Sequence, residues 1–346
     1  MYVVGTQSTG YGYGLRVEVR SKPDGSLARV WSSADPRFGA YSADCTVAGG
    51  RLYVVHEGWG IAVFDLELNL LNHVGGFRSG SATSVVSHGS YLYVAGYEFT
   101  EGGYTRWRVE KWVVNGSNLT LAKEYVSDPT PLSDKAMRVA ANPLTGHVWV
   151  VGSEGDGRFR VEILDQDVNS VRVVRRADRW LAYAVDFDEE GYAYVSGDSF
   201  VAKYDTYGNE VVAWEERGWW APKVLYASGF LYVGANALCW GSTTAALYIF
   251  SRDLRQVGTL CLREVLERWG KVAFDCRSIY LAGYDSTTWV TLSVVVNLSN
   301  VVVVTLTATV TRAEVPLGPE AVPLIAAVAL VVGVALGASI GRRGRY

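Results

Sequence analysis

A short strand pattern recurs along almost the whole chain: an aromatic residue, then usually Val, then in most copies Gly two places further on. The aromatic residues of successive copies are 51, 40, 56, 45, 38 and 48 positions apart. A period of about 40–50 residues with several strands per unit is typical of propeller blades. The repeat therefore predicts one ring of similar units rather than two separate cores. Its copies contain Tyr2, Tyr53, Tyr93, Trp149, Tyr194, Tyr232 and Tyr280.

Each copy is flanked by further strands in which apolar and polar residues alternate, and by turns rich in Gly, Asn and Asp. This period of two indicates antiparallel β-structure. Six units contain four predicted strands each, whereas the first contains three, at residues 2–5, 15–19 and 27–31. We therefore expect an all-β fold: a seven-bladed β-propeller of four-stranded antiparallel blades over residues 1–312, with the first blade lacking its inner strand.

The clearest unit carries a family resemblance. Residues 188–197 read DEEGYAYVSG, and residues 202–209 read AKYDTYGN. This resembles the D-x-x-G-x-x-Y-V-x-G and K-Y-D-x-x-G-N pattern of NHL-like and SBBP-type β-propeller repeats of prokaryotic surface proteins. The match is sharp over residues 181–216 and looser elsewhere in 1–312. It implies a fold and not a function, because propellers have many unrelated roles.

Composition removes several classes of protein. The chain has 346 residues, of which 49% are hydrophobic and 19% charged, with a net charge of −3. Such apolar content argues against disorder, and the slight negative charge argues against nucleic-acid binding. Only one stretch is long and apolar enough to span a membrane, which argues against a polytopic membrane protein.

That stretch, residues 321–341, carries no charge and has the length of a transmembrane helix. The short basic tail 342–346 follows it, so the positive-inside rule predicts a cytoplasmic C-terminus and a propeller outside the plasma membrane. Residues 313–320, with Pro316 and Pro319, form the predicted stiff spacer. The alternative is a buried core helix or a mobile tail.

The N-terminus conflicts with this topology, because Met1 is not followed by a signal peptide. The missing signal and the missing first strand suggest that the natural start lies upstream. The alternatives are a tail-anchored protein facing the cytoplasm and a three-stranded first blade. Three N-x-[ST] sequons, at Asn115, Asn118 and Asn297, favour the extracellular face and are candidate glycosylation sites. Arginine is much commoner than lysine, and Met and Cys are scarce, which suggests an archaeal thermophile or a biased genome.

Catalytic and metal-binding motifs are not evident in the sequence. The histidines His56, His73, His88 and His147 are scattered, and the four cysteines form no C-x-x-C pair. We therefore expect no metal and no cofactor. Cys239 and Cys261 belong to one predicted blade and either form a disulfide in an oxidising exterior or remain free thiols.

One set of residues is a candidate ligand site. An acidic or amide residue follows the second strand of every unit, and in a propeller these loops share one face around the central channel. Carboxylates with exposed aromatic rings suit sugar recognition. The alternative is that these side chains only cap turns and that the tryptophans pack between blades. The candidate ligand-binding residues are Glu57, Glu98, Glu154, Asp198, Asp285, Trp59, Trp219, Trp220 and Trp240, and Gln7 and Asn236 complete the ring.

These features favour a membrane-anchored cell-surface propeller that binds a protein, an envelope glycan or another polymer on its loop face, and that is not an enzyme. The first alternative is a propeller-type lyase or hydrolase that uses carboxylates of the ring. The second is a structural component of the cell envelope.

Overall fold

The computed structural model describes residues 1–8, 13–21, 26–33, 35, 37–38, 44–76, 78–128, 130–239, 242–261, 268–274, 278–285, 288–295 and 309–313. Every regular element in these ranges is a β-strand, as the alternation of the sequence predicts, and all pairs are antiparallel. Among these residues no helix is long and apolar enough to cross a membrane. Residues 321–341, where we predicted one, lie outside them.

The strands form sheets that follow the chain in order. The described part of the first sheet has three strands, as the repeat predicts: β1 (Tyr2–Ser8), β2 (Tyr13–Arg20) and β3 (Leu27–Ser33). Four sheets have four strands. These are β4 (Asp44–Ala48), β5 (Arg51–His56), β6 (Gly60–Phe64), β7 (Leu70–Val74); β8 (Gly80–His88), β9 (Tyr91–Phe99), β10 (Thr105–Asn115), β11 (Asn118–Val126); β12 (Lys135–Ala141), β13 (Val148–Glu154), β14 (Arg158–Leu164), β15 (Ser170–Trp180); and β22 (Arg268–Phe274), β23 (Ser278–Asp285), β24 (Thr288–Val295), β25 (Thr309–Ala313).

The remaining sheet has six strands and contains two copies of the sequence repeat. Its strands are β16 (Ala182–Phe187), β17 (Ala193–Tyr204), β18 (Glu210–Ala227), β19 (Phe230–Cys239), β20 (Ser242–Ser251) and β21 (Gln256–Cys261). The first part of β18, 210–215, pairs with β17, and its last part, 223–227, pairs with β19. β18 is therefore the outer strand of one repeat unit and the inner strand of the next.

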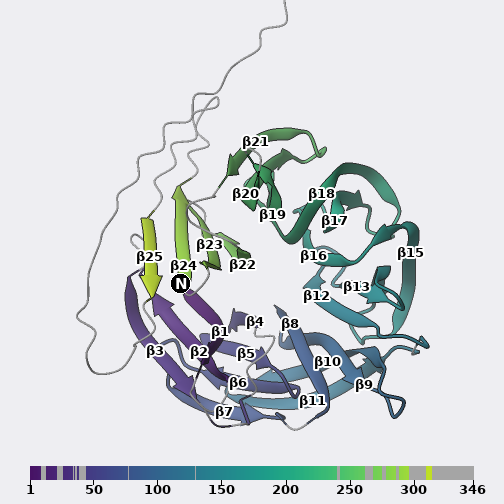
Figure 1. Ribbon diagram of the computed structural model, residues 1–346. Coiled ribbons are helices and arrows are strands. Elements are labelled where there is room, and N and C mark those ends of the chain that lie inside the picture. The colour runs from purple at the N-terminus through teal and green to yellow at the C-terminus, as the bar shows by residue number, and fades with distance from the viewer. Residues whose placement is uncertain are drawn as a thin grey trace, which may run out of the picture.

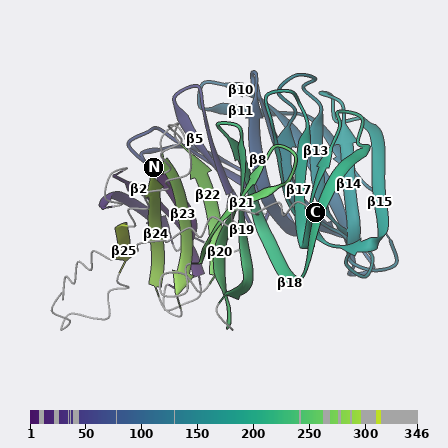
Figure 2. The same ribbon diagram turned by 90° about the horizontal axis from the view of Figure 1, so that it is seen from above.

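The sheets are arranged around a common centre, as in a propeller (Figure 1), and Figure 2 shows them standing side by side when seen from above. The strands β4, β8, β12, β16 and β18 succeed one another at this centre, each in contact with the next. An all-β, propeller-like fold is therefore confirmed.

The repeated aromatic residue joins neighbouring sheets. Tyr53, Tyr93 and Tyr194 are fully buried, and their hydroxyls donate to backbone carbonyls in a hairpin turn of the following repeat unit. The acceptor for Tyr93, for example, is the Gln166 carbonyl at 2.9 Å. A buried hydroxyl needs such a partner, so the tyrosine both fills the core and fixes the position of the next sheet.

The repeated glycine allows a bulge in several inner strands, whereas β4, whose repeat has His56 in place of the glycine, has none. The register of β8, β12 and β16 shifts by one residue opposite Gly96, Gly152 and Gly197. A Cβ on Gly152 would lie 2.0 Å from the Lys135 carbonyl oxygen, which excludes a larger residue. Bulges turn side chains and are frequent beside functional sites. Here the residues that follow the bulge line the centre of the molecule.

Candidate functional site

Four charged residues from different inner strands meet at the centre of the described structure. They are Asp44 on β4, Arg138 on β12, Asp186 on β16 and Lys223 on β18, and we call them the channel cluster. Arg138 and Lys223 come directly after a register shift of their strands. A bulge inserts one residue into a strand, so it changes the face of the sheet from which the following side chain projects.

An ion pair joins two inner strands that are not direct neighbours. Asp44 Oδ2 accepts from Arg138 Nη1 at 2.8 Å and from the Val85 backbone N–H at 3.2 Å. The Asp44 side chain is 1% exposed and that of Arg138 is 29% exposed. In the ring, β8 lies between β4 and β12, so this contact spans the width of one inner strand.

Asp186 and Lys223, the other two members of the channel cluster, have strongly shifted pKa values. Burial raises the pKa of Asp186 to about 6, against the lowering effects of the Tyr226 backbone N–H, which donates to Oδ2 at 2.7 Å, and of Arg138. Burial lowers the pKa of Lys223 to about 7, and the nearby positive charge of Arg138 lowers it further. Lys223 makes no hydrogen bond or ion pair with any residue that the structure describes. A carboxylate and an amine that both titrate near neutrality are suited to proton transfer.

The sequence analysis did not identify this cluster. Asp186 is the one charge of its strand, in Val185-Asp186-Phe187, whereas Arg138 and Lys223 share their strands with other charges. A charge inside an apolar strand is the one sequence feature that indicates such a site, because a buried charge needs a partner or a function. The sequence does not show which strands share the centre.

The residues of the predicted loop ring do not all meet in one site, and they have different partners in the structure. Glu98 forms ion pairs with Arg106 and Arg108, and Glu154 accepts from Arg175 at 2.7 and 2.8 Å. These two carboxylates are therefore engaged by arginines of their own sheets. The Glu57 carbonyl accepts a hydrogen bond from His56 Nδ1 at 2.9 Å.

Asp198 and Trp220 do come together. They are cross-strand neighbours on β17 and β18, and Asn236 of β19 lies opposite Trp220 on its other side. Tyr183 of β16 lies close to the Asp198 carboxylate and contacts the Trp220 ring. The side chains of Asp285, Trp240 and Gln7 lie outside the described part of the structure.

Two of the candidate tryptophans belong to the core. Trp59 and Trp219 are each 2% exposed. Trp59 Nε1 donates to the Tyr97 carbonyl at 3.0 Å, and the Arg108 guanidinium lies over its ring. Trp219 packs edge-on against Trp214 and Tyr248. Neither ring is available to stack on a ligand from solvent.

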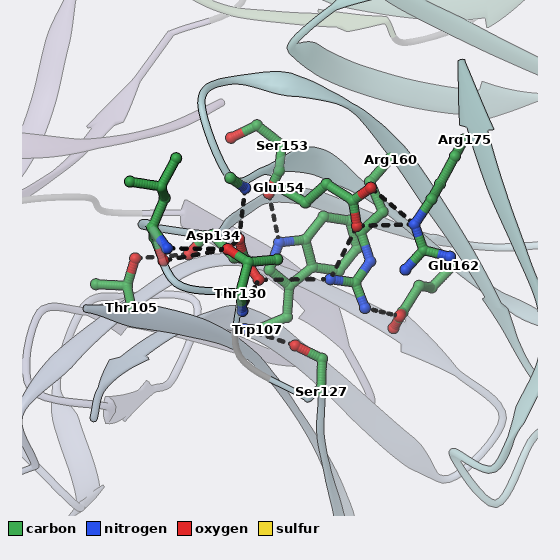
Figure 3. A network of polar contacts seen from close by, with 12 residues as sticks. Thr105, Trp107, Ser127, Thr130, Asp134, Ser153, Glu154, Arg160, Glu162 and Arg175 are labelled. Carbon is green, nitrogen blue, oxygen red and sulfur yellow. Dashed lines mark hydrogen bonds and ion pairs between the residues drawn. The ribbon is translucent and has the colours of Figure 1, made fainter. Parts of the chain in front are cut away.

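A second polar network joins the sheets β8–β11 and β12–β15 (Figure 3). Arg160 lies with its guanidinium 4.6 Å from the centre of the Trp107 ring and forms ion pairs with Glu162 and with Asp134. The Trp107 indole N–H donates to the Ser153 carbonyl at 2.9 Å. Because Arg160, Glu162 and Asp134 are all nearly inaccessible, this network serves to hold two sheets together.

The structure also brings together two histidines that look unrelated in sequence. His56 and His73 stack with their Nε2 atoms 3.0 Å apart. His56 Nδ1 donates to the Glu57 carbonyl, so its Nε2 is the acceptor and His73 Nε2 the donor. Burial lowers the pKa of His56 to about 4. Among the described residues no group of three metal-ligating side chains is present.

The remaining candidates concern modification and cysteines. Asn115 and Asn118 are exposed and face each other at the hairpin between β10 and β11, whereas Asn297 lies outside the described residues. Cys261 forms a disulfide bond. Cys45 is free, and burial raises its pKa to about 11, which makes it a poor nucleophile at neutral pH.

These features define a propeller-like protein with a charged centre. No family model and no curated protein matches the sequence, so the resemblance to NHL-like and SBBP-type repeats gains no support there. Solved structures do match. A provisionally assigned 6-phosphogluconolactonase of Bacteroides fragilis superposes with a TM-score of 0.63 at 12% identity, over 90% of this chain and 95% of its own.

Two further structures are similar to this fold. A provisionally assigned 6-phosphogluconolactonase of Bacteroides uniformis has a TM-score of 0.61 at 15% identity, over 90% of this chain and 96% of its own. A chain of the mitotic checkpoint complex has a TM-score of 0.60 at 14% identity, over 78% of both chains. At these identities the likeness establishes the fold.

The comparison corrects the functional prediction. We expected a binding module and no enzyme, whereas two of the propellers that this chain resembles carry the name of a lactone-hydrolysing enzyme. That expectation is therefore wrong, and the alternative of an enzymatic propeller is the better one. Motif searches compare neighbouring positions along the chain, whereas the four charges of the channel cluster come from strands far apart in sequence.

Proposed function

We propose that the protein is a hydrolase that opens a small cyclic ester, such as the lactone of a sugar acid, in the channel between its inner strands. The observation that carries this proposal is the convergence of Arg138, Asp186 and Lys223 on one channel, with the Lys223 amine unpaired among the described residues. The names of the two similar bacterial propellers agree with it.

In the proposed reaction, ionised Asp186 accepts a proton from a water molecule as its oxygen attacks the ester carbonyl. The permanent positive charge of Arg138 stabilises the oxyanion that develops, an effect that is strong in a partly desolvated site. Protonated Lys223 then donates its proton to the ring oxygen as the C–O bond breaks. One water is consumed, and the product is an open-chain hydroxy acid.

The test is hydrolysis of 6-phosphoglucono-δ-lactone and of glucono-δ-lactone by the purified protein, followed as acid release above the spontaneous rate. We expect Lys223→Met and Asp186→Asn each to lower kcat by about 100-fold or more. The matched control is Lys123→Met, because Lys123 is exposed on β11 and bonds only to Asn169 on the outside. A wild-type protein that opens neither lactone would refute the proposal, and so would full activity in Lys223→Met.

The organisation of the whole chain also remains a proposal. We propose seven blades, obtained by dividing the six-stranded sheet within β18, and membrane attachment through residues 321–341 with the propeller outside and the tail 342–346 in the cytoplasm. The disulfide at Cys261 supports an oxidising compartment. Protease treatment of intact cells tests this orientation: we expect the propeller to be cleaved, whereas its protection would argue for the opposite side.

A further inference from the structure

A row of side chains crosses three neighbouring strands beside Lys223. Asp198 lies opposite Trp220, and Trp220 lies opposite Asn236, from β17 through β18 to β19. Directly opposed residues of an antiparallel pair project from the same face of the sheet. The carboxylate, the indole and the amide therefore share one face, and Lys223 follows three residues after Trp220 on the same strand.

The row is held in place by Tyr183. Its hydroxyl lies close enough to the Asp198 carboxylate to raise the pKa of the phenol, and its ring meets the Trp220 ring edge-on, with the centroids 5.5 Å apart. Burial raises the pKa of Tyr183 and that of Asp198. Tyr183 thus contacts both Asp198 and Trp220. Its single O–H can occupy at most one of the acceptor positions of the Asp198 carboxylate.

Some of the hydrogen-bonding capacity of the row is unused. The Asn236 Oδ1 atom is buried and has no hydrogen-bond partner. The Trp220 indole N–H lies close enough to the Tyr183 hydroxyl to affect its pKa, but it makes no hydrogen bond of good geometry. A buried acceptor without a partner is costly, and a bound ligand can supply the missing donor.

We propose that Tyr183, Asp198, Trp220 and Asn236 form a subsite that binds the hydroxyl groups of a polyol. The Asp198 carboxylate and Asn236 Oδ1 lie two strands apart, so they suit two hydroxyl donors at separate positions along one polyol chain, and the indole between them offers a face for the intervening C–H groups. The subsite rests on the proposed lactone hydrolysis only for the identity of its ligand. It would hold the hydroxylated part of the substrate while the ester lies near Lys223.

The experiment measures binding directly, without turnover. Isothermal titration of Lys223→Met with D-gluconate and with neutral D-glucitol reports affinity in a protein that does not consume ligand. We expect Asp198→Asn and Asn236→Leu, each in this background, to weaken binding of both ligands by about ten-fold or more. The control is Asp156→Asn, since Asp156 is a half-exposed carboxylate on a hairpin of another sheet. Thermal unfolding of each variant checks that the fold is retained.

The outcomes separate the two proposals. Glucitol binding that depends on Asp198, in a protein that opens no lactone, supports the subsite and refutes the hydrolase. Lactone hydrolysis with an unchanged KM in Asp198→Asn and Asn236→Leu supports the hydrolase and refutes the subsite. Binding of gluconate alone, with no binding of glucitol, also refutes the subsite, because the carboxylate and not the hydroxyls would then be recognised.

Discussion

Asp44 Oδ2 and Arg138 Nη1 lie 2.8 Å apart although 94 residues separate them in sequence. The pair joins β4 to β12 past the strand β8 that lies between them. We expect Asp44→Ala to lower the free energy of unfolding by roughly 1.5–3 kcal/mol, because Arg138 then loses a charged hydrogen-bond partner. Urea denaturation measures the change. The double variant Asp44→Leu with Arg138→Met should recover part of the loss, and a double variant no better than Asp44→Ala would contradict this account.

The glycine of the repeat offers a second prediction. Gly152→Ala should lower the free energy of unfolding by about 3 kcal/mol, because its Cβ would clash with the Lys135 carbonyl at the bulge. The control is Gly258→Ala on β21, where the nearest atom lies 3.7 Å away. We expect that control to be neutral or stabilising by about 0.5–1 kcal/mol. Equal effects of the two changes, measured by denaturation, would exclude the bulge as the reason for the glycine.

The two arginines labelled in Figure 3 should contribute unequally to the free energy of unfolding. Arg160→Met leaves the buried carboxylates Glu162 and Asp134 without their cation, so we expect a loss of roughly 3–5 kcal/mol in unfolding free energy. Arg175→Met removes an exposed pair with Glu154 and should cost about 1 kcal/mol or less. Thermal and chemical denaturation compare the two, and a larger effect at Arg175 would contradict the assigned roles.

The histidine pair predicts a loss of stability in acid. His56 has a folded pKa of about 4 against 6.5 for the free side chain. The unfolded chain therefore binds more protons between these values, and stability falls as the pH drops from about 6.5 to 4. The difference in unfolding free energy between the wild type and His56→Gln should narrow or change sign over this range. A pH-independent difference would show that His56 does not titrate as described.

The channel cluster predicts the pH dependence of catalysis. Asp186 acts as a base above its pKa of about 6, and Lys223 acts as an acid below its pKa of about 7. The plot of kcat/KM for lactone opening against pH should therefore be bell-shaped, with its maximum between these values. Lys223→Arg keeps the positive charge but does not titrate in this range, so the alkaline limb should disappear. A wild-type rate that stays constant up to about pH 9 would exclude Lys223 as the acid.

Much of the fold was predictable because the repeat residues have local and recurring tasks. The repeated aromatic residue fills a core position, and in Tyr53, Tyr93 and Tyr194 its hydroxyl also bonds to a backbone carbonyl. The repeated glycine leaves room for the backbone carbonyl at a bulge. The Asp and Asn of the hairpin turns are equally local: in residues 205–209, Asp205 accepts from the backbone N–H groups of Tyr207 and Asn209. Such constraints act within one blade or between two neighbours, so they recur at the period of the sequence.

The candidate site was less predictable. Glu98, Glu154 and Asp198 occupy equivalent places in the repeat, yet two are held by arginines and only Asp198 joins a tyrosine and a tryptophan. The difference arises from neighbouring strands, which the position in the repeat does not describe. The burial of Trp59 and Trp219 is decided in the same way.

By itself, the sequence determined the all-β class, the repeating unit and the residues that build each turn, because these depend on alternation and on contacts between nearby positions. Only the tertiary structure decided which charges share the centre. Asp44, Arg138, Asp186 and Lys223 are separated by tens of residues, and they meet because the inner strands lie side by side around one axis. The altered pKa values of Arg138, Asp186 and Lys223 follow from that shared, partly desolvated position.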